Sequence, residues 1–271
     1  MPELPEVETL CRGLRDAVIG RTIRHVVVRQ ARLRLPVPPD LPSLLEGLTL
    51  RSVSRRAKYL LIDLGRGSLI VHLGMSGSLR VLPQDTPARK HDHLDLLLDQ
   101  GLLIRLSDPR RFGAVLWTQT DAAGHPLLKD LGIEPLSAPF DGSWLYAHTR
   151  GKKGSIKQAL MDGRFIAGIG NIYANEALFG AGVHPRTPAG RLGRARCERL
   201  AAAIRETLDA ALAAGGSSLR DFVHTTGESG YFQVQWRVYG RVGLPCPRCT
   251  TPLRQMRQGA RSTFYCPKCQ K

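Results

Sequence analysis

Two pairs of cysteines near the end of the chain have the spacing of a metal site. They occur as CPRC and CPKC, with sixteen residues between the pairs. Thiolates at this spacing close the tetrahedral site of a zinc ribbon, and the spacer has a suitable length for a β-hairpin. A redox role for one C-x-x-C is the alternative, but two pairs within a short basic segment favour zinc. We expect one structural Zn²⁺, without an open position for chemistry, at Cys246, Cys249, Cys266 and Cys269.

The chain opens with MPELPE, which places two prolines and two carboxylates ahead of the first apolar run. Proline suits the first turn of a helix, and acidic side chains near a helix N-terminus interact favourably with the helix dipole. A helix start therefore explains the residue types at Pro2, Glu3, Pro5 and Glu6 without any chemistry. It does not explain why an end that normally frays should carry them.

The charge of the chain indicates a polyanionic partner. The 271 residues include 39 Lys and Arg but only 23 Asp and Glu, which gives a formal net charge of +16. Phosphates neutralised by such a surface release condensed counterions, so nucleic acid is the expected partner. Acidic lipid, or no special partner, is the alternative. The sequence has neither an apolar stretch long enough to span a membrane nor a signal peptide, so we expect a cytoplasmic protein with reduced thiols and no membrane partner.

Apolar periodicity predicts strands first and helices second. A helix is expected over 5–19, and short strands follow between 22 and 118 as TIRHVVVRQ, KYLLIDL, SLIVHL, HLDLLL, LLIRLS and AVLWT. Residues 119–150 lack a clear period and are interpreted as a domain connection. Helical periods then return in SIKQALMD, NIYANEALFGAG and RARCERLAAAIRETLDAALAAG. This order predicts an α+β protein with an antiparallel sandwich or flattened barrel followed by a helical domain. Cys11 and Cys197 lie on the apolar stripes and are expected to be buried.

Five motifs in one order carry a family resemblance. They are MPELPEVET, HLGMSGSLR (72–80), DPRRFG (108–113), GIGNIYANE (168–176) and the two cysteine pairs. Together they resemble the bacterial formamidopyrimidine-DNA glycosylases, base-excision repair enzymes that remove oxidised purines. The related endonuclease VIII prefers oxidised pyrimidines and typically has Gly where this chain has Leu4, which favours the purine branch.

The resemblance implies the architecture of the whole chain. An N-terminal antiparallel β-sandwich with flanking helices is expected over 1–132, and a hinge over 133–150. A helix–two-turns–helix domain is expected over 151–235, and a four-cysteine zinc finger with a β-hairpin over 237–271. The implied protein is a monomer that acts on double-stranded DNA containing oxidised bases.

The resemblance also gives the opening residues a chemical role. Removal of Met1 would expose Pro2 as a secondary amine, and an α-amino group titrates near pH 8, so part of it is unprotonated at neutrality. Such an amine can attack the deoxyribose C1′ and form a Schiff base. The family assigns proton donation during sugar-ring opening to Glu3, and Glu6 is expected to position the amine. The iminium then allows β- and δ-elimination, to which the family match assigns Lys58 and Arg261.

Reaching C1′ requires the nucleotide to be flipped out of the duplex. In the family, three side chains fill the hole that the flipped nucleotide leaves, and they match Met75, Arg110 and Phe112 here. The Arg110 guanidinium is expected to hydrogen-bond the orphaned cytosine. On sequence alone, Met75 as a core residue and Phe112 as strand packing are equally acceptable.

Further matches are contacts to DNA or to the lesion. Lys152, Lys157 and Asn171 match family residues that contact phosphates or the lesion strand. The glycines at 168 and 170 would let the backbone approach phosphates closely. His91 matches a DNA contact, although a metal pair with His93 is conceivable. The stretch TTGESGYFQ (225–233) matches a loop that closes over the flipped base. The predicted function is a bifunctional DNA glycosylase and apurinic/apyrimidinic lyase. Its rivals are endonuclease VIII specificity and a catalytically silent DNA-binding protein.

Overall fold

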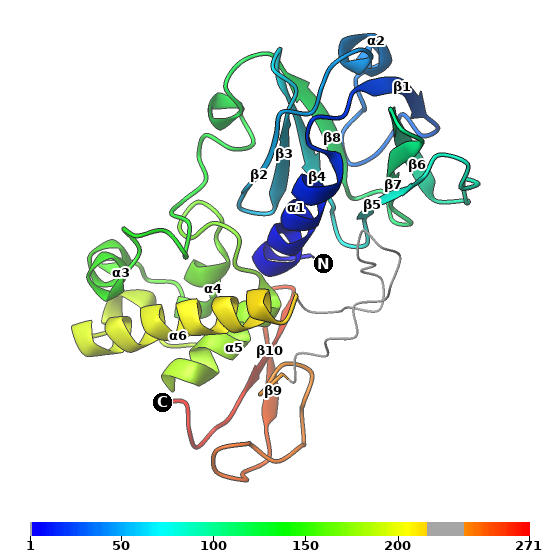
Figure 1. Ribbon diagram of the computed structural model, residues 1–271. Coiled ribbons are helices and arrows are strands. Elements are labelled where there is room, and N and C mark those ends of the chain that lie inside the picture. The colour runs from blue at the N-terminus through cyan, green and yellow to red at the C-terminus, as the bar shows by residue number, and fades with distance from the viewer. Residues whose placement is uncertain (1, 216–235) are drawn as a thin grey trace. The chain divides into compact units, whose positions relative to one another are not determined.

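A computed structural model describes residues 2–215 and 236–271, which form two compact units (Figure 1). The N-terminal unit extends to Asp130. The C-terminal unit contains Leu131–Ala214 and the described residues from 236 onward. The proposed lesion loop at 225–233 lies outside the described residues.

The N-terminal unit begins with helix α1 (Leu4–Val18), one residue earlier than the periodicity predicts. Its apolar stripe is buried and includes Leu10, Cys11, Leu14 and Val18. Proline in the first turn and the Glu3 N-cap start the helix.

Two four-stranded antiparallel sheets enclose the core of this unit. One has the order β2 (Ser52–Arg56), β3 (Tyr59–Asp63), β4 (Ser68–His72) and β8 (Ala114–Thr118). The other has the order β1 (Ile23–Val28), β6 (Asp92–Leu98), β7 (Leu102–Ser107) and β5 (Ser78–Pro83). Alternate residues of both sheets share one apolar core, as in a sandwich. Short helix α2 (Leu41–Leu45) packs beside β1.

The six expected strands are present, and two further strands escaped the sequence pattern. Edge strand β2 buries only Val53, so its sequence SVSRR lacks the apolar alternation that identifies a half-buried strand. Strand β5 also carries little alternation, because only its first two residues are buried. Both are defined by pairing, β2 with β3 and β5 with β7.

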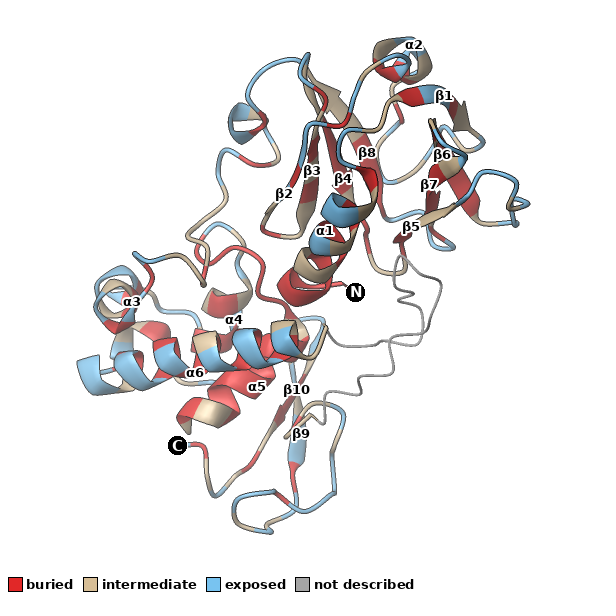
Figure 2. Cartoon of the chain, in the orientation of Figure 1, coloured by how far each residue is buried: buried red, intermediate tan, exposed pale blue. Residues whose placement is uncertain are grey.

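The C-terminal unit is helical around a second core. The helices among its described residues are α3 (Gly142–Thr149), α4 (Ile156–Met161), α5 (Asn171–Ala181) and α6 (Arg194–Ala213), together with the 3-10 turn η2 (Ala189–Arg191). Another 3-10 turn, η1 (Ala122–Gly124), lies in the N-terminal unit. Helix α5 is buried along most of its length, whereas α6 exposes one face (Figure 2). None of the described helices is both long and apolar enough to cross a membrane.

The expected hinge at 133–150 differs from the structure. Phe140 and Leu145 are fully buried in the core of the C-terminal unit, and α3 packs against α6. The periodicity failed here because the apolar residues of GSWLYAHT do not recur at a helical spacing. The chain therefore passes between the units near Asp130, and all of 133–150 belongs to the second one.

The C-terminal residues form a two-stranded antiparallel hairpin of β9 (Arg254–Gln258) and β10 (Arg261–Tyr265). A small core supports it, and α5 contributes Phe179 to that core beside Val238, Leu253 and Phe264. The spacer between the cysteine pairs is thus the predicted hairpin.

Candidate active site and nucleic-acid interface

The residues at the start of α1 are buried and held by a helix cap. Pro2, Glu3 and Glu6 all have little exposed surface. The backbone N–H of Glu3 donates to Glu6 Oε2 at 2.7 Å. Glu6 therefore fixes the backbone directly after Pro2. Its predicted role in positioning the Pro2 amine stays a prediction. The helix-start interpretation and the chemical one are compatible.

A polar chain joins α1 to the turn that carries Lys58. Arg55 Nε donates to Glu8 Oε2 at 3.0 Å, and Arg55 Nη1 donates to the Ala57 carbonyl at 2.8 Å. Arg56 pairs with Tyr59 across β2 and β3, so Ala57 and Lys58 form a two-residue hairpin turn. Ala57 has φ of 54°, a conformation that this tight turn imposes. Lys58 is half-buried at the turn, one residue before β3.

His72 belongs to this part of the N-terminal unit, and the sequence analysis missed it. Burial, followed by the positive charges of Arg34 and Lys58, lowers the pKa of His72 to about 4. Its Nδ1 accepts a hydrogen bond from the Gly74 N–H at 3.0 Å. The neutral imidazole is therefore the form that fits. The pairing of His72 with Tyr59 across the sheet, which the sequence does not show, brings it beside the Lys58 turn.

The three residues predicted to fill the hole, Met75, Arg110 and Phe112, lie on two loops that touch. Gly74 has φ of +63°, and a Cβ on it would lie 2.4 Å from the Phe112 carbonyl carbon. The turn carrying Met75 therefore packs directly on the backbone of the loop carrying Arg110 and Phe112. Met75 is only partly buried and lies outside the core, and the Phe112 residue is 44% exposed. Arg110 Cζ lies 4.8 Å from the Phe112 ring centroid. These placements disfavour the interpretation as core packing.

His91 and His93 lie near one another but do not form a metal site. Their ring centroids are 6.5 Å apart, and buried His93 uses Nε2 in a 2.8 Å contact with the Asp108 carbonyl oxygen. Within the described part of the chain, the four cysteines are the only group of three or more side chains able to hold a metal. His91 is half-buried one residue before β6. Its contact with DNA stays a prediction.

In the C-terminal unit, the predicted phosphate contacts have different surroundings. Lys152 is partly exposed, with Nζ 4.6 Å from the Phe165 ring centroid. Asn171 is the first residue of α5, and its carbonyl accepts a hydrogen bond from Asn175 Nδ2. Gly168 has φ of +89°, which favours glycine at the approach to this helix.

Lys157 does not match its predicted role as a phosphate or lesion-strand contact. The residue is 1% exposed, and its Nζ donates to the Ser262 carbonyl at 3.0 Å and to Thr263 Oγ1 at 2.7 Å. Its ammonium is therefore used inside the C-terminal unit, where it joins α4 to β10. The sequence GKKGSIK shows three lysines but not which of them turns inward.

Arg261 occupies the exposed start of β10. It pairs with Gln258 across the hairpin, and the two residues share a surface pocket with Lys157. Gln258 Nε2 donates to Ser155 Oγ at 3.0 Å, which ties the hairpin to the N-terminus of α4. Arg261 thus lies next to a turn that hydrogen bonds hold to α4.

The four cysteines converge as the spacing predicts. Their sulfur atoms all lie within 4.8 Å of one another, with 3.9 Å between Cys246 and Cys269 and 3.5 Å between Cys249 and Cys266. Four thiolates bound to one tetrahedral Zn²⁺ require similar separations, since each Zn–S bond is about 2.3 Å. Burial and the neighbouring sulfurs raise the pKa of Cys269 to about 12. A divalent cation removes that penalty by stabilising the thiolates.

Three family models match successive parts of the chain. They are the formamidopyrimidine-DNA glycosylase N-terminal domain at 1–115, the H2TH domain of the same glycosylase at 131–223, and a zinc finger found in FPG and IleRS at 243–271. The chain belongs to the formamidopyrimidine-DNA glycosylase family. This membership makes it a DNA repair glycosylase with a zinc finger, and it confirms the resemblance and the structural zinc.

Relatives named formamidopyrimidine-DNA glycosylase match over the full length. The protein of Thioalkalivibrio sulfidiphilus is 57% identical over 271 residues, and that of Bordetella pertussis is 57% identical over 275 residues. Each alignment covers 100% of both chains.

Solved glycosylase structures share the fold. The Lactococcus lactis Fpg, in a complex with abasic-site DNA, is 35% identical with a TM-score of 0.92 over 100% of both chains. The MutM (Fpg) protein of Thermus thermophilus is 40% identical with a TM-score of 0.88, and the match covers 99% of this chain and 98% of that one. These matches confirm the predicted α+β fold.

Proposed function

We propose that this member of the formamidopyrimidine-DNA glycosylase family is bifunctional, both excising oxidised purines and cleaving the strand at the resulting abasic site. The observation that carries the proposal is the start of α1, where Pro2 precedes a buried Glu3 whose N–H is held by Glu6. A backbone nitrogen at this position becomes a nucleophilic secondary amine once Met1 is removed.

The proposed reaction uses Pro2 as the nucleophile. Its nitrogen bonds to C1′ while the bond from C1′ to the damaged base breaks, and the departing base takes up a proton. Glu3 donates a proton to the ring oxygen as the sugar opens, which leaves an iminium between Pro2 and C1′. Loss of the C2′ proton then expels the 3′ phosphate, and a second elimination expels the 5′ phosphate. Hydrolysis of the remaining Schiff base releases the amine.

Lys58 and Arg261 assist the two eliminations in this proposal. Lys58 acts in the β-step from a hairpin turn that Arg55 connects to α1. Arg261 acts in the δ-step from the exposed start of β10. Bound zinc stabilises the finger that carries Arg261 and takes no part in the chemistry, because four cysteines fill its coordination sphere.

The proposed substrate is duplex DNA, bound by a monomer. Arg110 bonds the orphaned cytosine, while Met75 and Phe112 fill the space of the flipped nucleotide. His91, Lys152 and Asn171 contact the DNA around it. The net charge of +16 supports a phosphate-rich partner.

Similar structures support damaged DNA as the substrate but not one class of lesion. Lactococcus lactis glycosylases similar to this chain have been solved with abasic-site DNA, with Fapy-dG DNA and with DNA containing an oxidised pyrimidine. The purine preference therefore rests on Leu4 and the motifs. Excision assays on matched 8-oxoguanine and thymine-glycol duplexes test it. Faster cleavage of 8-oxoguanine is expected, a preference for thymine glycol would indicate endonuclease VIII specificity, and binding without cleavage would contradict an enzyme.

A further inference from the structure

We propose that Asp108 is a positioning residue that locks the Met75 turn to the Arg110–Phe112 loop, so that the three filling residues enter DNA as one rigid body. The inference rests on the proposed DNA-binding role of these residues. It adds a residue that neither touches the base nor takes part in the chemistry.

The Asp108 side chain joins the two loops directly. The residue is fully buried, and its Oδ1 accepts a hydrogen bond from Ser76 Oγ at 2.9 Å. Its Oδ2 accepts a hydrogen bond from the Gly113 N–H at 2.7 Å, at the end of the second loop. The Arg110 N–H lies 3.3 Å from Oδ1. One carboxylate thus holds the residue after Met75, the backbone of Arg110 and the residue after Phe112.

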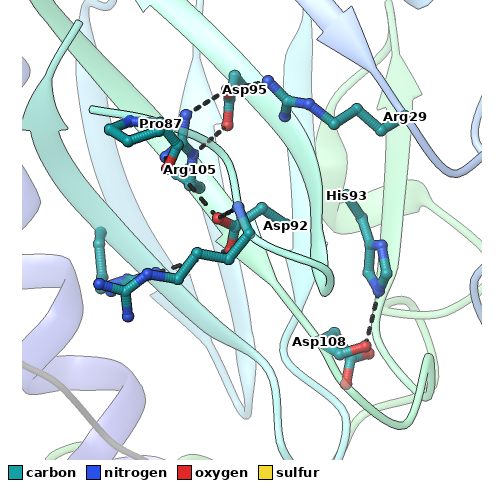
Figure 3. A network of polar contacts seen from close by, with 9 residues as sticks. Arg29, Pro87, Asp92, His93, Asp95, Arg105 and Asp108 are labelled. Carbon is teal, nitrogen blue, oxygen red and sulfur yellow. Dashed lines mark hydrogen bonds and ion pairs between the residues drawn. The ribbon is translucent and has the colours of Figure 1, made fainter. Parts of the chain in front are cut away.

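The Asp108 backbone fixes this junction to the sheet. Its N–H donates to the His91 carbonyl at 3.0 Å, and its carbonyl oxygen is 2.8 Å from His93 Nε2 (Figure 3). His93 is buried in β6, so the anchor belongs to the rigid part of the sandwich. The contact with the carbonyl requires the proton of His93 to be on Nε2.

The chemistry of the donors explains why the residue is a carboxylate. Three donors contact the two carboxylate oxygens of Asp108. They are the Ser76 hydroxyl, the Arg110 N–H and the Gly113 N–H. An asparagine of the same shape keeps one acceptor oxygen but must turn its NH₂ toward one of these donors. With the NH₂ toward Gly113, the bond that closes the second loop is lost and the Gly113 N–H is left unsatisfied. With the NH₂ toward Ser76, the Ser76 hydroxyl must reverse and accept, and the Arg110 N–H loses its acceptor on residue 108. The exposed Phe112 ring and the Arg110 guanidinium would lose their fixed spacing from Met75.

This coupling matters for specificity more than for overall affinity. Phosphate contacts elsewhere hold the duplex whether or not the loops are locked. Discrimination between opposite bases depends on where the Arg110 guanidinium lies when Met75 and Phe112 occupy the hole. A loosened junction therefore reduces the preference for cytosine over adenine while leaving binding largely intact.

The test compares Asp108→Asn and Ser76→Ala with Asp121→Asn and Ser43→Ala, which make the same substitutions at exposed sites away from these loops, where Asp121 accepts from the Ala123 N–H and Ser43 donates to the Asp40 carbonyl. A duplex with a tetrahydrofuran abasic analogue and 2-aminopurine beside the orphaned base reports insertion by fluorescence, without any chemistry. Excision opposite cytosine and adenine gives a second readout. We expect Asp108→Asn to lose most of the fluorescence change and about tenfold of the cytosine preference, the equivalent of one hydrogen bond. Ser76→Ala should fall between it and the controls.

Unchanged fluorescence and unchanged base preference in folded Asp108→Asn and Ser76→Ala would overturn the proposal. If Asp108→Asn does not fold, Ser76→Ala decides, because it removes one hydroxyl and leaves the Asp108–Gly113 bond in place. If the wild-type protein inserts into the duplex but excises nothing, the proposed function fails, and the fluorescence comparison still decides the role of Asp108.

Discussion

Lys157 donates from Nζ to Thr263 Oγ1 at 2.7 Å, which joins α4 to the second strand of the zinc hairpin. Thr263 Oγ1 in turn donates to Gln258 Oε1 at 3.0 Å, and Gln258 reaches back to Ser155 at the start of α4. This closed ring of hydrogen bonds surrounds the base of the turn that presents Arg261. A buried lysine therefore supports the proposed catalytic hairpin from behind.

Lys157→Met and Lys152→Ala should have opposite consequences. The buried Lys157 amine donates to the Ser262 carbonyl and to Thr263 Oγ1, so its loss should lower the free energy of unfolding by about 1–3 kcal/mol. The salt dependence of DNA binding should not change. Lys152→Ala should leave stability nearly unchanged and lower the salt slope by about one phosphate contact. Urea unfolding and binding titrations at several salt concentrations measure both quantities, and a lower salt slope for Lys157→Met would contradict the internal assignment.

Arg110→Ala tests the reading of the orphaned base. The guanidinium lies over the exposed Phe112 ring and is free of the core, so its removal should leave stability within about 0.5 kcal/mol. Excision opposite cytosine should fall by about tenfold or more, since a bidentate base contact contributes about 1–3 kcal/mol. Non-specific binding should keep its salt slope. A variant that changes salt slope and excision in the same way as Lys152→Ala would show that Arg110 is a phosphate contact instead.

Cys249→Ser should release the zinc and reduce DNA affinity together. The finger has only a small apolar core, and two of that core's buried residues are themselves cysteines, so the hairpin needs the metal to fold. Metal content by atomic emission and binding to abasic-site DNA measure the two losses. Cys197→Ser serves as the control, because this buried thiol lies on α6 outside the cluster. Full zinc content in Cys249→Ser would refute the four-cysteine site.

His72 should make the N-terminal unit less stable in mild acid. Its folded-state pKa of about 4 lies below the ordinary value of 6.5, so the unfolded chain takes up the proton first. The stabilisation is fully present above pH 6.5 and is lost as pH falls from 6.5 toward 4, at about 1.4 kcal/mol per pH unit. NMR should show the His72 imidazole still neutral at pH 5. Titration near pH 6.5, or an equal acid sensitivity in His72→Asn, would contradict this.

Much of the architecture could be predicted because it depends on patterns of neighbouring residues, such as apolar periodicity and cysteine spacing. The apolar period of α6 and the spacing of the cysteines each depend on residues close in sequence, and both predictions are confirmed. The edge strand β2 and helix α3 were missed because pairing or packing with distant segments defines them. Their own side chains carry no clear period.

The site residues also fall into those that the sequence could identify and those that only the structure shows. The motifs identified Met75, Arg110 and Phe112, and the structure brings their two loops together. The inward direction of Lys157 and the junction at Asp108 depend on contacts between residues more than 30 positions apart. Such contacts leave no signal in one sequence, because a buried aspartate and an exposed one are the same letter.

The most direct measurement is borohydride trapping on damaged duplex DNA, with the adduct mapped by mass spectrometry. Protein with Met1 removed should form a covalent adduct at Pro2, since the free secondary amine attacks C1′. Protein with a residue or tag ahead of Pro2 has a tertiary amide there, whose delocalised lone pair cannot attack. It should bind the same duplex, form no adduct, and lose excision and strand cleavage together. Equal trapping of the blocked protein would contradict the account and would make a lysine, Lys58 first, the nucleophile.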